Sequence, residues 1–153
     1  MRVTLDSNVL VRALTSPQGP ALRLPDHILG AHTLILSRFI LDEVERVLMY
    51  PRLRERYRIT PAEAALFAGT LADAAQLVEP VVVEPVVLYD PNDDPVLYTA
   101  ADGNADILCT LNVKHFTAPL VLSFCSQRGI RVMTDVEVLR ELRALAGISS
   151  VVN

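Results

Sequence analysis

The sequence predicts an α/β domain in which a parallel sheet lies between two layers of helices, and three observations favour this class. Short apolar stretches typical of strands alternate with longer stretches of helical periodicity. Two Thr-x-x-Glu capping boxes and several prolines mark the starts of helices. Several acids follow or flank strands, as they do at the ligand crevice of an open parallel sheet. A chain of 153 residues suffices for one domain with a buried core.

Composition and charge limit the class of protein. The hydrophobic fraction is 51% and the mean hydropathy is +0.33, yet no apolar run is long enough to span a membrane. The chain leads directly into a strand, which leaves no room for a signal peptide. Cys109 and Cys125 match no metal or redox spacing, so we expect reduced thiols in a cytoplasmic protein. The 3 histidines form no ligand pair, which argues against zinc. The net charge of −4 excludes a generally basic surface but not a local basic patch.

The first strand is predicted at Arg2–Leu5 and is followed directly by Asp6. This acid either caps the next helix, Val9–Leu14, or faces a ligand at the end of the strand. Three prolines make Thr15–Pro25 irregular, with at most a broken helix over Ala21–Leu29.

The second strand, Thr33–Leu36, leads to a helix over Arg38–Tyr50 that Ser37 caps. At helical periodicity Glu43 falls on the apolar face of this helix, whereas the other acids fall outside it. A buried carboxylate requires a partner, so we expect a divalent cation or an arginine near Glu43 unless its head reaches solvent at the edge of that face.

A connection over Pro51–Arg58 is rich in arginine and follows Arg46. It is either a solvated charged turn or a surface that binds phosphates, with Tyr50 and Tyr57 available to stack on bases. The residues predicted to bind RNA are Arg46, Arg52 and Arg54, and Lys114 further along the chain.

The middle of the chain begins with a capped helix, Pro61–Leu77, followed by strand-like pieces at Val81–Val83 and Val86–Leu88. Asp94-Pro95 then reads as a cap and first position of a helix that ends at Gly103-Asn104. A strand over Ala105–Thr110 follows. The aspartates around this helix are Asp90, Asp93, Asp94 and Asp106. They either bracket a ligand crevice or serve only as a cap and a turn.

The last third is predicted to be a loop, a helix, a strand and a final helix. These lie at Val113–Ala118, Leu120–Gln127, Ile130–Met133 and from the Thr134 capping box to about Leu145. We expect one domain over residues 1–146 and a tail over residues 147–153 that is loose or docked on a partner.

Acids from distant parts of the chain can meet over one edge of such a sheet. Crowded carboxylates repel one another unless they are protonated or neutralised by a cation. Oxygen ligands from Asp, Glu and Asn suit Mg²⁺ or Mn²⁺, which support hydrolysis of phosphodiesters. Two rival classes lack their own signals. A haloacid-dehalogenase-type phosphatase needs an acid where this chain has Asn8, and nucleotide-binding domains need a glycine-rich first turn.

Four blocks of the sequence resemble the motifs of the PIN domain family. They are LDSNVLVRAL, SRFILDEVERVL, DPNDDPVLYTAA and ADILCTLNVKHF. The resemblance is closest to the toxin components of bacterial toxin–antitoxin pairs, relatives of VapC, and it spans nearly the whole chain. It implies a sheet of order 3-2-1-4-5 and an RNA-cleaving site dependent on Mg²⁺ or Mn²⁺.

The resemblance also implies roles for individual residues. The catalytic acids would be Asp6, Glu43 and Asp94, and Ser7, Asn8 and Thr110 would support them. In the fourth block the family commonly has an acid where this chain has Asn112 and His115. The predicted metal ligands are thus Asp6, Glu43, Asp94 and Asn112. Asp106, at the start of its strand, would supply the missing carboxylate if that strand presents it to the crevice.

The expected partners are RNA, a cognate antitoxin and a second copy of the chain in a homodimer, with no membrane. A cationic side chain of the antitoxin could enter the acidic crevice. The alternative is a non-catalytic PIN module that binds RNA or a protein through the same groove.

Overall fold

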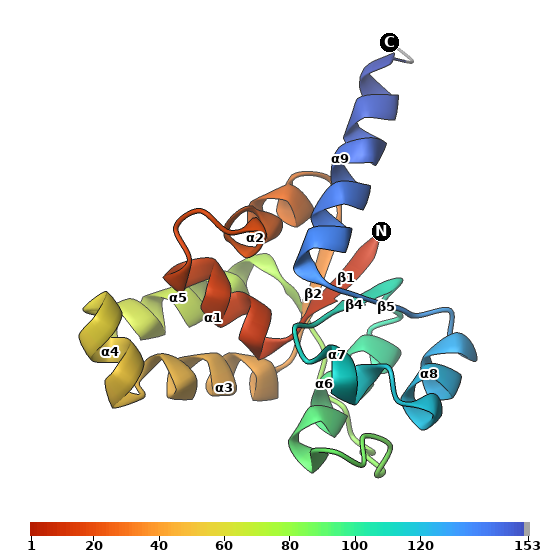
Figure 1. The fold of residues 1–153 in the computed structure, drawn as a ribbon, viewed down its shortest axis with the longest axis horizontal. Helices are drawn as coiled ribbons and strands as arrows, with labels where there is room; N and C mark the ends of the chain where they lie inside the picture. Colours follow the sequence, from red (N-terminus) through yellow and green to blue (C-terminus); the bar gives the residue numbers. More distant parts are fainter. Residues whose placement is uncertain (152–153) are drawn as a thin grey trace.

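The structure is a computed structural model that describes residues 1–151, with side chains for residues 1–147. It contains a five-stranded parallel sheet in the order β3-β2-β1-β4-β5 between helical layers (Figure 1), which confirms the predicted class and strand order. The elements are β1 (Arg2–Leu5), α1 (Ser7–Thr15), α2 (Pro20–Ala31), β2 (Thr33–Leu36), α3 (Arg38–Leu48), α4 (Pro51–Tyr57), α5 (Pro61–Ala74), β3 (Gln76–Leu77), η1 (Pro91–Asp93), α6 (Asp94–Asp102), β4 (Ile107–Cys109), α7 (Val113–Phe116), α8 (Pro119–Ser126), β5 (Arg131–Met133) and α9 (Asp135–Val151).

Strand β1 is the centre of the sheet and pairs with β2 on one side and β4 on the other. The backbone amide of Asp6 donates to the Cys109 carbonyl oxygen at 2.9 Å, so the carboxyl ends of β1 and β4 lie together. Since strand–helix–strand crossovers are right-handed, the steps from β1 to β2 and from β4 to β5 place their helices on opposite faces. The fold therefore gathers residues that follow β1 and β4 at one edge.

The prediction of an irregular stretch over Thr15–Pro25, with at most a broken helix over Ala21–Leu29, is corrected. Helix α2 is continuous from Pro20 to Ala31. Pro20 is its first residue, where a missing amide costs nothing, but Pro25 lies inside it. Ala21, Leu24 and Ile28 are fully buried, and α2 packs against α1 and α9. Burial of this apolar face outweighs the hydrogen bond that Pro25 cannot make.

Three further segments differ from the prediction. The arginine-rich connection is the helix α4, which Pro51 begins and Arg58 ends in the left-handed region at φ 53°. The helix α5 ends at Ala74, and Gln76 and Leu77 form the edge strand β3 beside β2. The predicted loop after Asn112 contains the short helix α7.

The pieces Val81–Val83 and Val86–Leu88 form no strand in the described chain. Val86 and Val87 instead donate their backbone amides to Oδ1 of Asp94, at 2.9 and 2.8 Å. The amides that a strand would use for its ladder are satisfied by a carboxylate, so this connection crosses the fold as irregular backbone.

The C-terminal capping box is confirmed, because Thr134 and Glu137 exchange backbone and side-chain hydrogen bonds. Helix α9 runs past the predicted end at Leu145 to Val151, and residues 152 and 153 of the predicted tail lie outside the described residues. Figure 1 shows the far end of α9 projecting beyond the sheet. Among the described residues, no helix combines the length and apolarity that crossing a membrane requires.

Gly103, which ends α6, permits a close approach to β2. A Cβ atom at this position would overlap the Cγ2 methyl of Ile35 and lie 2.9 Å from the Thr99 carbonyl oxygen. We expect Gly103→Ala to lower the free energy of unfolding by roughly 1–3 kcal/mol, because neither neighbour can move without disturbing the core. Denaturant unfolding measures the change.

The matched control is Gly69→Ala within α5, where an added Cβ meets nothing within 4 Å. This change should raise stability by roughly 0.5–1 kcal/mol through helix propensity alone. Equal effects of the two substitutions would contradict the packing explanation for Gly103.

Candidate active site

Asp6 lies at the carboxyl end of β1 and is 1% exposed. Its Oδ2 atom accepts hydrogen bonds from Asn8 Nδ2 at 2.9 Å and Thr110 Oγ1 at 2.7 Å. Asn8 Oδ1 in turn accepts the backbone amide of Leu111 at 3.2 Å. Asn8 and Thr110, two of the three supporting residues that the resemblance implies, therefore bind the first acid and tie it to the segment after β4.

Burial is the main cause that raises the pKa of Asp6 to about 6. The Thr110 hydrogen bond lowers the pKa, and the nearby charges of Asp93 and Glu43 raise it again. The hydrogen-bond donors that surround this carboxylate are neutral, so its negative charge is poorly compensated. A cation beside Asp6 would supply the missing charge.

Glu43 reaches the same place from α3. Its Oε2 accepts a 2.7 Å hydrogen bond from the Ser7 hydroxyl, which also lies 3.4 Å from Asp6 Oδ1. One hydroxyl group thus separates the two carboxylates. The other oxygen of Glu43 is 3.2 Å from Arg46 Nη2. The sequence required a partner for this acid, and the structure provides an arginine.

The third acid of the cleft is Asp93 and not the predicted Asp94. Asp93 is 7% exposed and lines the cleft with Asp6 and Glu43. Asp94 is not among the described residues that line it. Since its Oδ1 accepts the amides of Val86 and Val87, Asp94 fixes the preceding connection in place.

His115 pairs with Asp93. The Nδ1 atom of His115 lies 2.6 Å from Asp93 Oδ2. Burial raises the pKa of Asp93, and the hydrogen bond and charge of His115 oppose that shift. The imidazole ring also stacks on Tyr89, with 5.7 Å between ring centroids and 5° between planes.

Asn112 stands in the fourth motif block, where the resemblance leads us to expect an acid. Its side chain lines the cleft, while its backbone amide donates to Thr110 Oγ1 at 3.0 Å. The predicted contribution of Asp106 is corrected, because its Oδ2 accepts the backbone amide of Arg2 at 2.7 Å. Arg2 begins β1 and Asp6 follows its end, so Asp106 lies at the opposite edge of the sheet.

An open cleft of about 510 Å³ lies over the carboxyl edge of the sheet, and its lining includes Asp6, Glu43, Asp93 and Asn112. Within the described chain, no three His, Cys, Asp or Glu side chains converge as a ready-made metal group. Glu43 is paired with Arg46, and Asp93 with His115. The donors nevertheless fit Mg²⁺ or Mn²⁺ in kind, since four carboxylates (Asp6, Glu43, Asp90 and Asp93) line one cleft together with the amide side chain of Asn112.

The cationic residues predicted to bind RNA lie in three places. Arg46 lines the cleft and contacts Tyr50, with its guanidinium 5.6 Å from the ring centroid. Lys114 Nζ lies 5.0 Å from the ring centroid of Tyr89. Arg52 is exposed on α4 and has no ion pair within the described chain.

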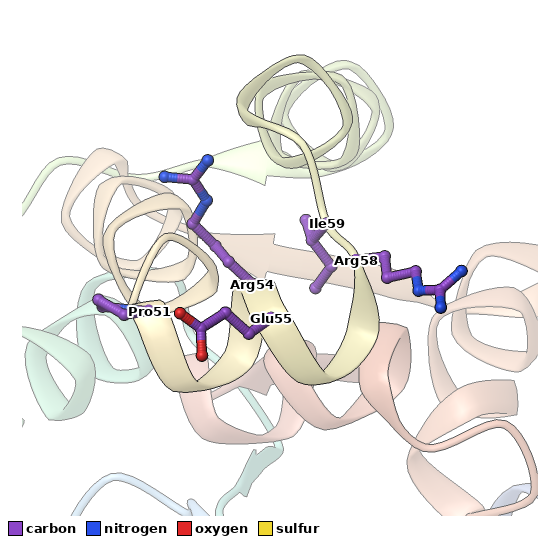
Figure 2. A pocket seen from close by; sticks show the side chains of 5 residues that line it. All are labelled: Pro51, Arg54, Glu55, Arg58 and Ile59. Atoms are coloured by element: carbon purple, nitrogen blue, oxygen red, sulfur yellow. The ribbon is translucent and has the colours of Figure 1, made fainter.

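Arg54 lies further along the same helix. It lines a pocket of about 470 Å³ formed by α4 and the two residues that follow it, together with Pro51, Glu55, Arg58 and Ile59. Figure 2 shows the side chains of Arg54 and Arg58 extending away from each other.

Sequence reasoning missed three residues of the site. Asp93 was left open between a ligand crevice and a turn, His115 was named only as a departure from the family pattern, and Tyr89 was not singled out. Proline after Asp94 places that residue at the start of the helix but does not show which carboxylate enters the cleft. No local pattern distinguishes which of two adjacent aspartates turns inward.

A parallel sheet of this order with acids over its carboxyl edge defines an open, doubly wound α/β domain whose candidate site lies where such folds bind ligands. The family model for the PIN domain matches residues 2–114, well over half of the chain. The chain therefore belongs to the PIN domain family.

Comparison with solved structures supports the fold. The crystal structure of VapBC2 from Rickettsia felis, bound to a DNA fragment from their promoter, contains a chain that matches with a TM-score of 0.54. The identity is 13%, and the match covers 86% of this chain and 98% of that one. A search among curated proteins gives no match.

Proposed function

We propose that this protein is a PIN-type endoribonuclease that depends on Mg²⁺ or Mn²⁺ and acts as the toxin of a toxin–antitoxin pair. One observation carries the proposal. Asp6, Glu43 and Asp93, which are far apart in the sequence, line one cleft in which the negative charge of Asp6 is poorly compensated. Family membership supports a nuclease, and the fold it shares with a chain of VapBC2 supports the toxin assignment.

Asp6, Glu43, Asp93 and Asn112 would hold the metal ion. When bound, such an ion lowers the pKa of a water and neutralises charge on the phosphate. The chain's own residues prepare the site. Ser7, Asn8 and Thr110 fix the carboxylates of Asp6 and Glu43 through the hydrogen bonds described above. Arg46 can turn from Glu43 to a phosphate oxygen, because its guanidinium is largely exposed.

A cognate antitoxin is the proposed protein partner. The cleft presents carboxylates that are only partly compensated, and an arginine or lysine from a partner segment would complete their pairing. A homodimer is part of the same proposal. Exposed Leu14 and Leu66 flank a groove of about 580 Å³ between α1 and α5, which gives an apolar surface that association could cover.

The alternative function is a non-catalytic module that binds RNA or a protein partner. It is favoured by Asn112, which contributes no charge, and by the pairs that already engage Glu43 and Asp93. Both functions predict RNA binding, but only the nuclease predicts cleavage.

The test is an RNA cleavage assay with protein purified free of any partner. We expect cleavage in Mn²⁺ that stops with EDTA, and a loss of about 100-fold or more in Glu43→Gln. The matched control is Glu45→Gln on the same helix, whose side chain does not line the cleft within the described chain. RNA that binds but stays intact in Mn²⁺ would favour the non-catalytic module.

A further inference from the structure

Two tyrosines beside the acidic cleft each carry a cation. Tyr50 lines the cleft, and the Arg46 guanidinium lies against its ring. Tyr89 carries Lys114 and directly precedes Asp90, which also lines the cleft. Tyr89 is 58% exposed although it is one of the larger apolar side chains of the protein.

Contacts of the neighbouring backbone and of its own ring fix the position of Tyr89. Two and three residues upstream, the amides of Val87 and Val86 bind Asp94 Oδ1, which anchors the connection. Its ring is supported by His115, whose Nδ1 atom binds Asp93. A fixed, exposed ring beside the cleft needs no ordering when a ligand binds, so contact with it stabilises a complex efficiently.

We propose that Tyr89 is a stacking site for an unpaired nucleobase next to the phosphate bound in the acidic cleft. The proposal rests on the proposed ribonuclease function. Aromatic rings bind bases of any sequence through stacking. Lys114, whose Nζ atom lies over the ring of Tyr89, would turn from the ring to the adjoining phosphate when the base stacks there. A base in a helix is stacked on its neighbours and is not free to lie on a protein ring. The substrate would therefore be single-stranded at the cleavage position.

The chemistry of the cleft favours nucleic acid over a peptide at this ring. A carboxylate cleft that holds a cation recruits a phosphodiester. One tyrosine–cation pair lines this cleft, and the other adjoins Asp90, which lines it.

The experiment measures the affinity of a short, unstructured RNA in the Asp6→Asn background, where the RNA remains intact. Tyr89→Ala should weaken binding by about tenfold, and Tyr89→Phe should retain the wild-type affinity. The control is Leu88→Ala in the same connection, because Leu88 is 75% exposed but has no ring. It should bind as the background protein does.

The same RNA with one abasic residue, moved in turn along the chain, identifies the contact. At the stacking position the abasic RNA should bind the background protein and Tyr89→Ala equally, because the base that the ring contacts is missing. If Tyr89→Ala is tenfold weaker for every abasic RNA, or as tight as Tyr89→Phe for the normal one, the inference is wrong. Tight binding of a hairpin whose cleaved strand is fully paired would also overturn it.

Cleavage assays separate this inference from the proposed function. Wild-type protein that cuts RNA while Tyr89→Ala cuts it equally well would overturn the stacking site and leave the nuclease intact. Protein that neither binds nor cuts RNA in Mn²⁺ would overturn both.

Discussion

Asp6→Asn should abolish RNA cleavage and, at about pH 8, raise the free energy of unfolding of the metal-free protein by about 3 kcal/mol. The pKa of Asp6 is raised from 3.8 to about 6, chiefly by burial, so the folded state disfavours the ionised carboxylate. Between these two pH values the folded state binds more protons than the unfolded state. Stability is therefore lost as the pH rises through this window, and the full penalty is present above about pH 6.

Asparagine removes the charge and keeps the oxygen that Asn8 and Thr110 bind. We expect the melting temperature of the variant to exceed that of the wild type by roughly 6–12 °C at about pH 8, and the difference to shrink strongly near pH 4. Mn²⁺ should raise the melting temperature of the wild type more than that of the variant. Melting curves across this pH range test the prediction, and parallel stability profiles for the two proteins would contradict it.

Asp93→Asn should abolish cleavage, whereas Asp94→Asn should leave it nearly unchanged. Asp93 lines the cleft and interacts with the charges of Asp6 and Glu43, so its own charge belongs to the site. Asp94 uses one oxygen to accept two buried backbone amides, and the amide oxygen of asparagine can accept both. The measurement is the rate of RNA cleavage in Mn²⁺ for the two variants side by side.

Asp94→Ala separates structure from chemistry. It leaves the amides of Val86 and Val87 without their acceptor, so we expect a loss of roughly 2–4 kcal/mol in the free energy of unfolding. Asp93→Ala should lower the free energy of unfolding much less, because the side chain of Asp93 binds His115 and accepts no backbone amide within the described chain. Loss of cleavage in Asp94→Asn with normal stability would place Asp94 in the site after all.

Local patterns predicted most of the elements. The strands β1 and β2 and both capping boxes follow from alternating apolar runs and from the Thr-x-x-Glu pattern. The failures share one cause. In α2 the buried face outweighed Pro25, and at Val86 and Val87 a carboxylate from elsewhere replaced a strand ladder. Both are decided by partners far along the chain, which no local window contains.

The candidate site was predictable in part. Asp6 and Glu43 could be identified because one follows a strand and the other lies on an apolar helix face, and the structure brings both to one cleft. The pairing of Asp93 with His115 and the support of Tyr89 by that histidine could not be identified, because neither contact leaves a periodic signal. Asp106 stands at the start of its strand, and the structure places it at the amino edge of the sheet beside Arg2, away from the cleft.

The sequence by itself determined the class of fold and the family, since these depend on which residues are present and in what order. Only the tertiary structure decided between Asp93 and Asp94. Both are acidic and both are buried, but the amides of Val86 and Val87 hold Asp94 against the preceding connection and leave Asp93 to face the cleft. The physical reason is that a buried amide must find an acceptor, and the nearest carboxylate satisfied two of them at once.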